Sequence, residues 1–442
     1  MKLNAFLAKS TLIGALGGLL FGFDTAVISG TTDALTHYYG LSPRLLGVTV
    51  TSALLGTIMG AVFAGLPGER LGRRDSLKLT GILYLLSALG CAFAWNWGSL
   101  VVFRVIGGLG IGASSVLGPM YIAEIAPAKL RGRLVGAFQI NIVFGILVAY
   151  FSNYLISRSG FGFNEWRWEF GVAAIPAALF LGLLFAIPRS PRWLVKTGRL
   201  EEARSVLQKI GEENFDQEVQ DIANSIHLER NQPQEPLFSR KYAFPIFLAV
   251  SIGMFNQLAG INAILYYLND IFAFAGYSKL SGNLQAVAIG ATNLIFTLIA
   301  MSVIDRIGRK TLLLIGAAGT AVCLACVAAI FFTRHNQSYL LLILVAYIAF
   351  FAFSQGAVIW VYLAEVFPTA VRAKGQSLGS FSHWFMNGAI SLVFPILAAS
   401  SGAYPFVFFA AMTVLQFFVV LFFYPETKGI TLEDMQKKLG IA

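Results

Sequence analysis

The sequence has few charged residues and few cysteines, and each shortage excludes a class of protein. Asp, Glu, Lys and Arg make up 12% of the 442 residues and hydrophobic residues 57%, whereas soluble domains carry roughly 25% charged residues. One water-soluble core cannot bury so much apolar surface, so a bilayer is the natural solvent. Cys91, Cys323 and Cys326 all lie in apolar runs. They indicate packed helix residues rather than disulfides or a metal site.

Signatures of catalysis and of nucleotide binding are also missing. We find no set of nucleophile, base and orienting residue and no phosphate-binding loop, so we expect neither an enzyme nor an ATP-driven pump, and no cofactor. The segment RVIGGLGIGAS at 104–114 has glycines spaced as in a dinucleotide loop, but it follows no strand. Small residues that let helices pack closely explain it better.

Long apolar runs are what the sequence has in abundance. A helix that spans a bilayer needs about 20 mostly apolar residues. The first run is long and contains Asp24, so we expect a retained span rather than a cleaved signal peptide. The sequence therefore predicts an all-α membrane protein with about twelve spans, near 10–30, 45–67, 77–95, 100–122, 134–156, 168–187, 243–268, 284–304, 311–332, 339–362, 376–399 and 403–424.

The net charge of +10 follows the expected membrane topology. With both termini in the cytoplasm, most basic residues fall on the cytoplasmic side, as Lys and Arg do in membrane proteins. This distribution accounts for the charge without nucleic acid. It indicates a multi-pass protein of the plasma membrane, taken as a bacterial inner membrane, with both termini cytoplasmic. The basic residues left on the outer side are Arg44, Arg158, Arg167, Lys279 and Arg334.

Internal repetition predicts two six-helix halves. ERLGRR at 69–74 and YIAEIAPAKLRG at 121–132 match DRIGRK at 305–310 and YLAEVFPTAVRA at 362–373. Parallel repeats of this kind place a substrate site between the halves, near the midplane. The polar stretch between the halves has apolar residues at helical spacing, which predicts short amphipathic helices. We expect an N-terminal bundle at 1–188, a cytoplasmic helical linker at 189–242, a C-terminal bundle at 243–424 and a cytoplasmic tail at 425–442.

Asp24 is the candidate for proton coupling, because a carboxylate inside an apolar span is costly and indicates function. Asp24 lies about 21 Å from the cytoplasmic start of its helix, and Arg104 lies about 27 Å from the cytoplasmic end of its own helix. The two residues therefore differ in depth by about 6 Å, which an arginine side chain can span. The guanidinium favours the charged carboxylate, and burial favours the neutral one. A pair that forms and breaks during transport can take up and release a proton. A static ion pair is the alternative.

Buried amides and aromatic rings favour a sugar as substrate. Sugar hydroxyls both donate and accept hydrogen bonds, as amides do, and the CH faces of a sugar pack on flat rings. Gln257 and Asn262 lie about 140° apart on a straight helix, but Gly260 between them lets the helix unwind so that both face one cavity. Amides that hold helices together are the alternative. The candidates are Gln139, Asn256, Gln257, Asn262 and Asn293, with Trp360 and Trp384.

The motifs occur in order along nearly the whole chain and resemble those of the sugar porter family of the major facilitator superfamily. They are GGLLFGFDTAVISG at 17–30, GERLGRR at 68–74, SPRWL at 190–194, NQLAGINAILYY at 256–267, DRIGRK at 305–310 and PETKG at 425–429. The resemblance implies the major facilitator fold, sugar transport by alternating access and a functional monomer. It also implies proton coupling through Asp24 and Arg104, since the passive animal facilitators have a neutral residue in place of the aspartate.

The resemblance also implies roles for individual residues. By motif position, the sugar contacts are Gln139, Gln257, Asn262, Asn293, Trp360, Trp384 and Asn387. Asn256 and His383 also occupy sugar-contact positions, but the family usually has glutamine in place of Asn256 and glutamine or asparagine in place of His383. A cytoplasmic gate of ion pairs would consist of Glu69, Arg70, Arg73, Arg74, Glu124, Arg131, Asp305, Arg306, Arg309, Glu365 and Arg372. Basic loops required by topology alone are the alternative.

Three further positions depart from the family pattern. Glu69 replaces an aspartate, and Arg189 replaces a glutamate, so that PRSPR stands for PESPR. Ala173 stands where a proton-linked member has a second carboxylate in the sixth span. The first two changes alter the pairing within the gate, and the third leaves Asp24 as the predicted proton site.

The sequence therefore predicts a secondary transporter that imports a hexose or a pentose, with proton symport favoured over passive facilitation. A non-transporting sugar sensor usually needs a long cytoplasmic tail, and only a short segment follows PETKG. An exporter of apolar drugs would have fewer amides and more apolar walls. The expected partners are a sugar, a proton and the lipid bilayer.

Overall fold

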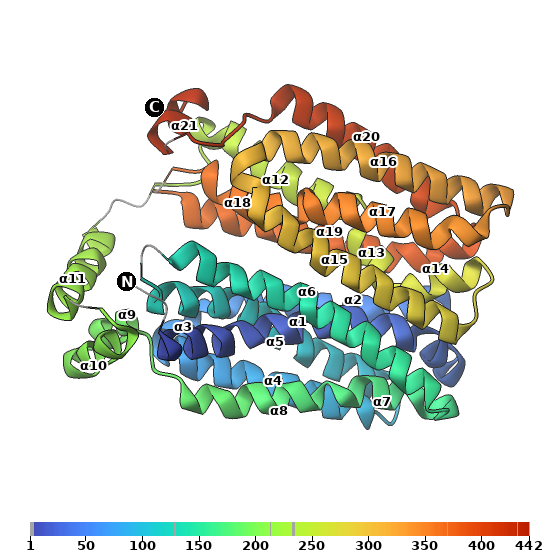
Figure 1. Ribbon diagram of the computed structural model, residues 1–442, viewed down its shortest axis with the longest axis horizontal. Helices are drawn as coiled ribbons and strands as arrows, with labels where there is room; N and C mark the ends of the chain where they lie inside the picture. Colours follow the sequence, from blue (N-terminus) through green and yellow to red (C-terminus); the bar gives the residue numbers. More distant parts are fainter. Residues whose placement is uncertain are drawn as a thin grey trace. The chain divides into compact units, whose positions relative to one another are not determined.

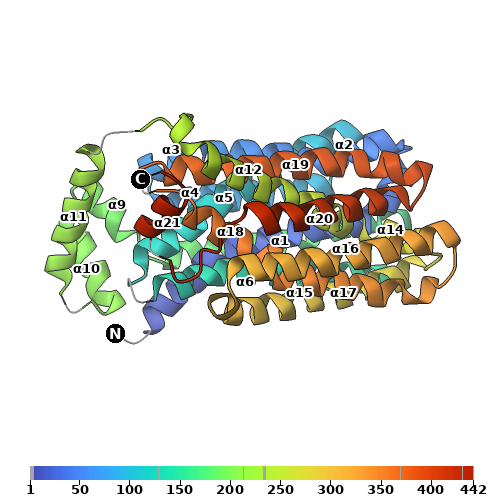
Figure 2. The same cartoon turned by 90° about the horizontal axis from the view of Figure 1, so that it is seen from above.

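The computed structural model describes residues 4–127, 130–212, 214–231, 235–368, 370–430 and 432–441. Within these ranges the chain is helical (Figures 1 and 2). Some residues of the predicted loops, among them Lys129 and the centre of the NQPQEP segment at 231–236, lie outside them.

Twelve helical segments in the described residues are long and apolar enough to cross a membrane, which confirms the predicted number. The first six are α1 (Ala5–Tyr39), α2 with α3 (Pro43–Phe63 and Gly65–Arg70), α4 (Arg73–Ala92), α5 (Trp97–Ile125), α6 (Arg131–Arg158) and α7 with α8 (Glu165–Val172 and Ala174–Leu183). The second six are α12 with α13 (Ala243–Leu258 and Ile261–Tyr266), α15 (Lys279–Ile307), α16 (Arg309–Thr333), α17 with α18 (Leu340–Phe353 and Gln355–Glu365), α19 (Arg372–Ser400) and α20 (Tyr404–Phe423).

The remaining helices are short. They are α9 (Pro191–Lys196), α10 (Leu200–Ile210), α11 (Phe215–Asn231), α14 (Leu268–Phe274) and α21 (Leu432–Lys438), with 3₁₀ turns at Gly162–Asn164, Leu184–Ala186, Arg240–Tyr242 and Gln337–Tyr339. Helices α10 and α11 occupy the two stretches whose apolar spacing predicts amphipathic helices.

The chain forms two compact units that divide three of the helices. Unit 1 comprises Met1–Val27, Ser52–Ser152 and Asn164–Gln232, and unit 2 comprises Ile28–Thr51, Asn153–Phe163 and Pro233–Ala442. The far end of α1, the start of α2 and the end of α6 thus cluster with the second half of the chain. The four-part division expected from the sequence stays a prediction.

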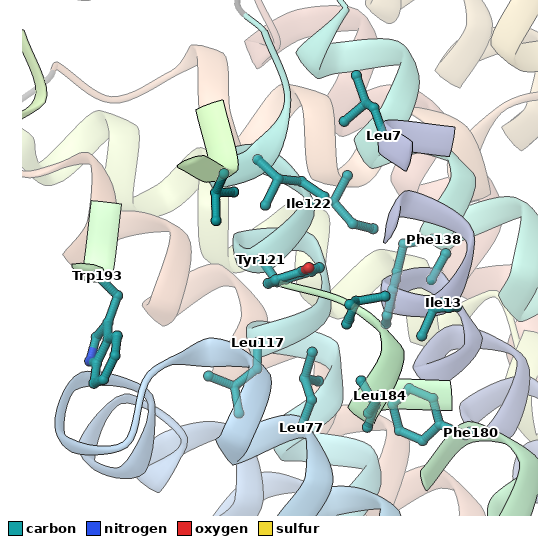
Figure 3. Packing of buried hydrophobic residues seen from close by; sticks show 14 of the residues in the cluster. Leu7, Ile13, Leu77, Leu117, Tyr121, Ile122, Phe138, Phe180, Leu184 and Trp193 are labelled. Carbon is teal, nitrogen blue, oxygen red and sulfur yellow. The ribbon is translucent and has the colours of Figure 1, made fainter. Parts of the chain in front are cut away.

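In unit 1, an apolar core joins the spanning helices to the helices that follow them. Buried residues of α1, α4, α5 and α8 continue into Trp193 and Leu194 of α9 (Figure 3). The Tyr121 hydroxyl donates to the carbonyl of Pro188 at 2.9 Å, and Trp193 Nε1 donates to the carbonyl of Glu69 at 3.0 Å. These bonds fix α9 against the ends of α3 and α5, and α10 and α11 pack on α9 (Figures 1 and 2).

The glycines of RVIGGLGIGAS bring α5 close to α2, as predicted. A Cβ atom on Gly108 would overlap the carbonyl oxygen of Ala53, and one on Gly112 would overlap that of Thr57. Only a residue without a side chain permits this approach. The segment is therefore a packing surface within a long helix and not a nucleotide loop.

Candidate functional site

A buried ion pair joins α1 to α5 in unit 1. Arg104 Nη1 donates to both carboxylate oxygens of Asp24, at 3.2 and 3.3 Å. The Arg104 side chain is 3% exposed and that of Asp24 is 21% exposed. The guanidinium also lies over the Phe170 ring, with Cζ 5.6 Å from the ring centroid. The pairing predicted from helix depth is present, and its part in proton coupling stays a prediction.

A small cavity adjoins the carboxylate of Asp24. Its space of about 20 Å³ is enough for one water molecule. The walls come from α1, α4 and the sixth span, and they combine apolar groups with the hydroxyls of Tyr84 and Ser87 and with Ala173. Asp24 therefore has an arginine on one side and a water-sized space on another, which are the surroundings that a group exchanging a proton needs.

Side-chain amides gather around the break between α12 and α13 in unit 2. Gly260 has φ +85°, in the left-handed region, and α13 begins at the next residue. Because the helix is interrupted there, Asn262 Nδ2 reaches Gln257 Oε1 at 3.2 Å. Gln257 Nε2 in turn lies 3.2 Å from Asn256 Oδ1 and 3.2 Å from a ring nitrogen of His383 on α19. The predicted unwinding at Gly260 and the resulting proximity of Gln257 and Asn262 are confirmed.

Aromatic rings surround the same histidine. The ring centroid of His383 lies 5.3 Å from that of Trp360 on α18 and 5.1 Å from that of Trp384. One turn further along α19, Asn387 Nδ2 donates to the Tyr266 hydroxyl at 3.2 Å. We use the name amide cluster for Asn256, Gln257, Asn262, His383, Asn387, Trp360 and Trp384.

Two predicted sugar residues stand outside the amide cluster. Gln139 is half-buried on α6 and belongs to unit 1, whereas the amide cluster belongs to unit 2. Asn293 is buried on α15. Their roles stay predictions, as do those of the residues in the amide cluster.

The predicted gate residues form one charged cluster in each half of the chain. In the first half, Arg73 Nη2 lies 2.9 Å from Glu124 Oε1, and the Ser190 hydroxyl donates to the other oxygen of Glu124. Arg74 and Arg189 both pair with Asp75, at 3.0 and 3.2 Å. At the edge of this cluster, Glu69 pairs with Lys196 at 2.8 Å.

In the second half, Arg309 takes the place of Arg73 and Glu365 that of Glu124. Arg309 Nη2 lies 2.9 Å from Glu365 Oε1 and 3.0 Å from Asp305. The Thr427 hydroxyl donates to Glu365 at 2.6 Å. Glu426 accepts the backbone N–H groups of Arg309 and Lys310 at 2.8 and 3.0 Å.

The carboxyl of Glu426 responds to two opposing influences. Burial raises the pKa of this carboxyl, and the backbone donors of Lys428, Arg309, Lys310 and Thr427 lower it. The donors prevail, so the pKa lies below its ordinary value. Glu426 is therefore charged at physiological pH, and its carboxylate caps the start of α16.

The other predicted gate residues lie around these clusters. Arg131 Nε donates to the carbonyl of Ala123 at 3.1 Å, and Arg372 Nε donates to that of Phe367 at 3.2 Å. Each bond links the first residue of a helix, α6 or α19, to a carbonyl group earlier in the chain. Arg70 and Arg306 are exposed.

The sequence reasoning missed several polar residues of the interior, among them Glu169, Gln355 and Asp270. Glu169 on α7 is fully buried. Gln355, at the start of α18, is buried, and among the described residues neither polar atom of its side chain has a hydrogen-bond partner. Asp270 on α14 lies next to Thr32 of α1, and burial raises the pKa of its carboxyl to about 7. A scan for every carboxylate or amide within ten residues of a span centre would have found Glu169 and Gln355.

The fold defines the class of protein. In the part of the chain that the structure describes, the twelve candidate spans include an ion pair and a cluster of amides. The chain matches the inward-open xylose transporter XylE from Escherichia coli with a TM-score of 0.88. The identity is 37%, and the match covers 98% of this chain and 100% of XylE. XylE bound to 6-bromo-6-deoxy-D-glucose matches with a TM-score of 0.81. The protein is a multi-pass membrane transporter with the major facilitator fold.

The chain belongs to the sugar transporter family, because residues 10–439 match the family model described as "Sugar (and other) transporter". The D-xylose-proton symporter of Escherichia coli K12 is 37% identical over 98% of this chain and 96% of its own length. The arabinose-proton symporter of Bacillus subtilis is 35% identical over 98% and 95%. The D-xylose transporter of Levilactobacillus brevis is 38% identical over 96% and 94%.

Proposed function

We propose that this transporter imports a monosaccharide, a pentose or a hexose, together with a proton. The observation that carries the proposal is the buried pair of Asp24 and Arg104 beside a cavity of water size. A chain that only let sugar pass down its gradient would have no use for so costly a charge in its interior. The names of the relatives, which include xylose-proton and arabinose-proton symporters, point the same way.

Coupling follows from the chemistry of the pair. When Arg104 contacts Asp24, the carboxylate is charged and compensated. When a rearrangement of the helices separates them, the buried carboxylate gains by binding a proton, because an isolated charge in the interior is expensive. Protonation from one side of the membrane and release to the other then tie the proton to the conformational cycle.

Sugar binding is assigned to the amide cluster, with Gln139 and Asn293. Amides in this number match the hydroxyls of a monosaccharide, and Trp360 and Trp384 offer flat faces for its CH groups. Gln355 adds a buried amide whose polar atoms have no partner among the described residues. A substrate hydroxyl or a water satisfies such a group.

The remaining expectations belong to the same proposal. Both termini face the cytoplasm of a bacterial cell, two bundles flank a cytoplasmic linker, and a monomer is the functional unit. The chain catalyses no covalent reaction. Passive facilitation is the alternative, and the following experiment distinguishes it from proton symport.

Uptake into proteoliposomes tests the coupling. With an inward proton gradient of about 2 pH units, one-to-one symport accumulates labelled sugar up to about 100-fold, because each tenfold ratio costs about 1.4 kcal/mol. Asp24→Asn is expected to abolish this accumulation while sugar exchange without a gradient continues. Accumulation that survives in Asp24→Asn, or wild-type protein that only equilibrates the sugar, contradicts the proposal.

A further inference from the structure

Glu169 lies on the buried face of α7. Trp166, Glu169 and Phe170 are 0%, 0% and 2% exposed, whereas Trp168 between them is 53% exposed. Their spacing of three and four residues is that of one helix face, and Ala173 continues the same face. Glu169 is therefore a carboxylate placed inside the protein, on a segment that counts as one of the twelve spans.

The same face leads to the cavity beside Asp24. Phe170 and Ala173, which follow Glu169 on this face, both line that cavity. Glu169 precedes Ala173 by one helical turn, about 6 Å along the axis. A buried carboxylate thus lies one turn away from the water-sized space that Asp24 borders.

Arg104 has an unused donor in this region. Its Nη1 binds Asp24, and its guanidinium covers the Phe170 ring. Its Nε is buried and has no hydrogen-bond partner among the described residues. Buried donors are nearly always paired, so this one indicates an acceptor, such as a water in the cavity, that joins the pair during the cycle.

We propose that Glu169 is a second proton-carrying group of this transporter, which passes its proton to Asp24 through a water in the cavity. In this step the O–H bond of the Glu169 carboxyl breaks and an O–H bond forms on the Asp24 carboxylate, so one negative charge moves from Asp24 to Glu169. Arg104 lies next to the cavity wall and compensates whichever carboxylate is charged. The inference rests on the proposed proton coupling and adds the route by which the proton arrives.

The other titratable groups near this route are few. Helix α4 offers Tyr84 and Cys91 on the cavity wall, α5 offers Arg104, and α8 has no titratable residue. On α7 itself, Arg167 donates to the carbonyls of Ala92 and Ala94 at 2.9 and 2.8 Å. Glu165 is half-buried, one turn before Glu169. Asp24 and Glu169 are thus the two buried carboxyls on this route, and neither tyrosine nor cysteine gives up a proton as readily.

The experiment compares Glu169→Gln with wild type in proteoliposomes. Initial rates of sugar uptake are measured while the outside pH is varied, alongside sugar exchange at equal pH on both sides. Glu169→Gln is expected to keep exchange and the half-saturating sugar concentration, to lose on the order of tenfold in the rate of proton-driven uptake, and to flatten its dependence on outside pH. Glu165→Gln, on the same helix but half-exposed, is the matched control and is expected to keep the wild-type profile.

Glu169→Asp is the control for a loss of folding. It keeps a carboxyl group and is therefore expected to restore part of the pH dependence of uptake. An unchanged pH profile in Glu169→Gln overturns the inference. So does a loss of exchange in Glu169→Gln that Glu169→Asp shares, because the residue is then structural. Asp24→Asn run in parallel separates the two proposals. If Asp24→Asn still accumulates sugar, the proposal of proton coupling through Asp24 is wrong. If Asp24→Asn loses accumulation but Glu169→Gln behaves as wild type, only the inference about Glu169 is wrong.

Discussion

Gln257, one of the proposed sugar contacts, shows how a buried amide can be hydrogen-bonded without sugar and still be able to bind one. Its Nε2 lies 3.2 Å from Asn256 Oδ1, and its Oε1 accepts from Asn262 at 3.2 Å. A sugar hydroxyl that replaces either partner exchanges one neutral hydrogen bond for another, at little net cost. Mutual pairing among amides therefore keeps buried polar groups satisfied between transport events.

Gln257→Ala tests this assignment. The change removes a donor and an acceptor and leaves Asn262 and Asn256 without their partner. Each lost hydrogen bond to a sugar hydroxyl is worth about 1 kcal/mol, so the half-saturating sugar concentration is expected to rise on the order of tenfold or more. Concentration-dependent exchange in proteoliposomes measures it.

Gln285→Ala is the control for that measurement. Gln285 is an amide of the same type on α15, and its Nε2 donates to Ser281 one turn away at 3.2 Å. Its removal is expected to leave the half-saturating concentration unchanged. An equal effect of both substitutions, or none for Gln257→Ala, would place the sugar elsewhere.

Single residues differ in how far the sequence alone identifies them. Asp24 stands in an apolar run with no other charge nearby, so its cost in a membrane predicts a functional role directly. Glu169 stands in EWRWEF, where tryptophans and charges indicate a membrane interface. Only the tertiary packing of α7, which turns Trp168 outward and Glu169 inward, shows that it is buried. Burial of this kind depends on contacts that no local pattern contains.

The two charged clusters show how one helix-end arrangement is built twice with different residues. Arg73 with Glu124 and Arg309 with Glu365 are equivalent ion pairs. Tyr121 and Tyr362 donate to the equivalent carbonyls of Pro188 and Pro425. The arrangements differ at Arg189 and Glu426. Glu426 caps the start of α16 directly, whereas Arg189 binds Asp75 in the first turn of α4.

This comparison predicts that Asp75 and Arg189 compensate each other. Thr311 occupies the position in the second half that Asp75 occupies in the first. Arg189→Glu alone places a second carboxylate beside Asp75. Asp75→Thr alone removes the carboxylate that pairs with Arg74, Lys78 and Arg189, so three positive charges lie close together without a counter-charge. Each is expected to lower the free energy of unfolding by roughly 1 kcal/mol, given the partial exposure of the pair.

The double change Asp75→Thr with Arg189→Glu copies the second half and is expected to recover most of that loss. The coupling energy between the two sites would be on the order of 1 kcal/mol. Thermal unfolding in detergent, followed by tryptophan fluorescence, measures all four proteins. Additive losses in the double variant would show that the two positions act independently.

Helix elements were predictable where a local pattern sets them. The number of spans and the break at Gly260 follow from apolar run length and from one glycine between two amides. The interruptions at Ala173 and Ser354 were not predicted. Pro176, which has no N–H to donate to the carbonyl of Val172, is a local signal for the first interruption. At the second interruption, the Ser354 hydroxyl donates a hydrogen bond to the carbonyl of Phe350 at 2.6 Å, and the Ser354 side chain packs against Gly316 of α16. Its backbone therefore follows a contact between helices rather than a local preference.

At the scale of the whole molecule, the distribution of charge predicts the orientation in the membrane. Lysines and arginines are frequent in the short helices α9, α10 and α11 and in the two charged clusters. The turns at the other helix ends hold few. An even number of spans places both termini on one side, and the excess of basic residues there favours the cytoplasm.

Cysteine accessibility in whole cells tests this orientation. In a background with Cys326→Ser, which removes the exposed native thiol while Cys91 and Cys323 stay buried, one cysteine is introduced at a time. Ser159→Cys lies in the exposed turn after α6, and Glu201→Cys lies on the exposed face of α10. A membrane-impermeant thiol reagent is expected to label Ser159→Cys in intact cells and Glu201→Cys only after the cells are opened. Because the two positions belong to opposite ends of the spans, the reversed pattern would invert the topology, and with it the direction in which Glu169 and Asp24 would pass a proton.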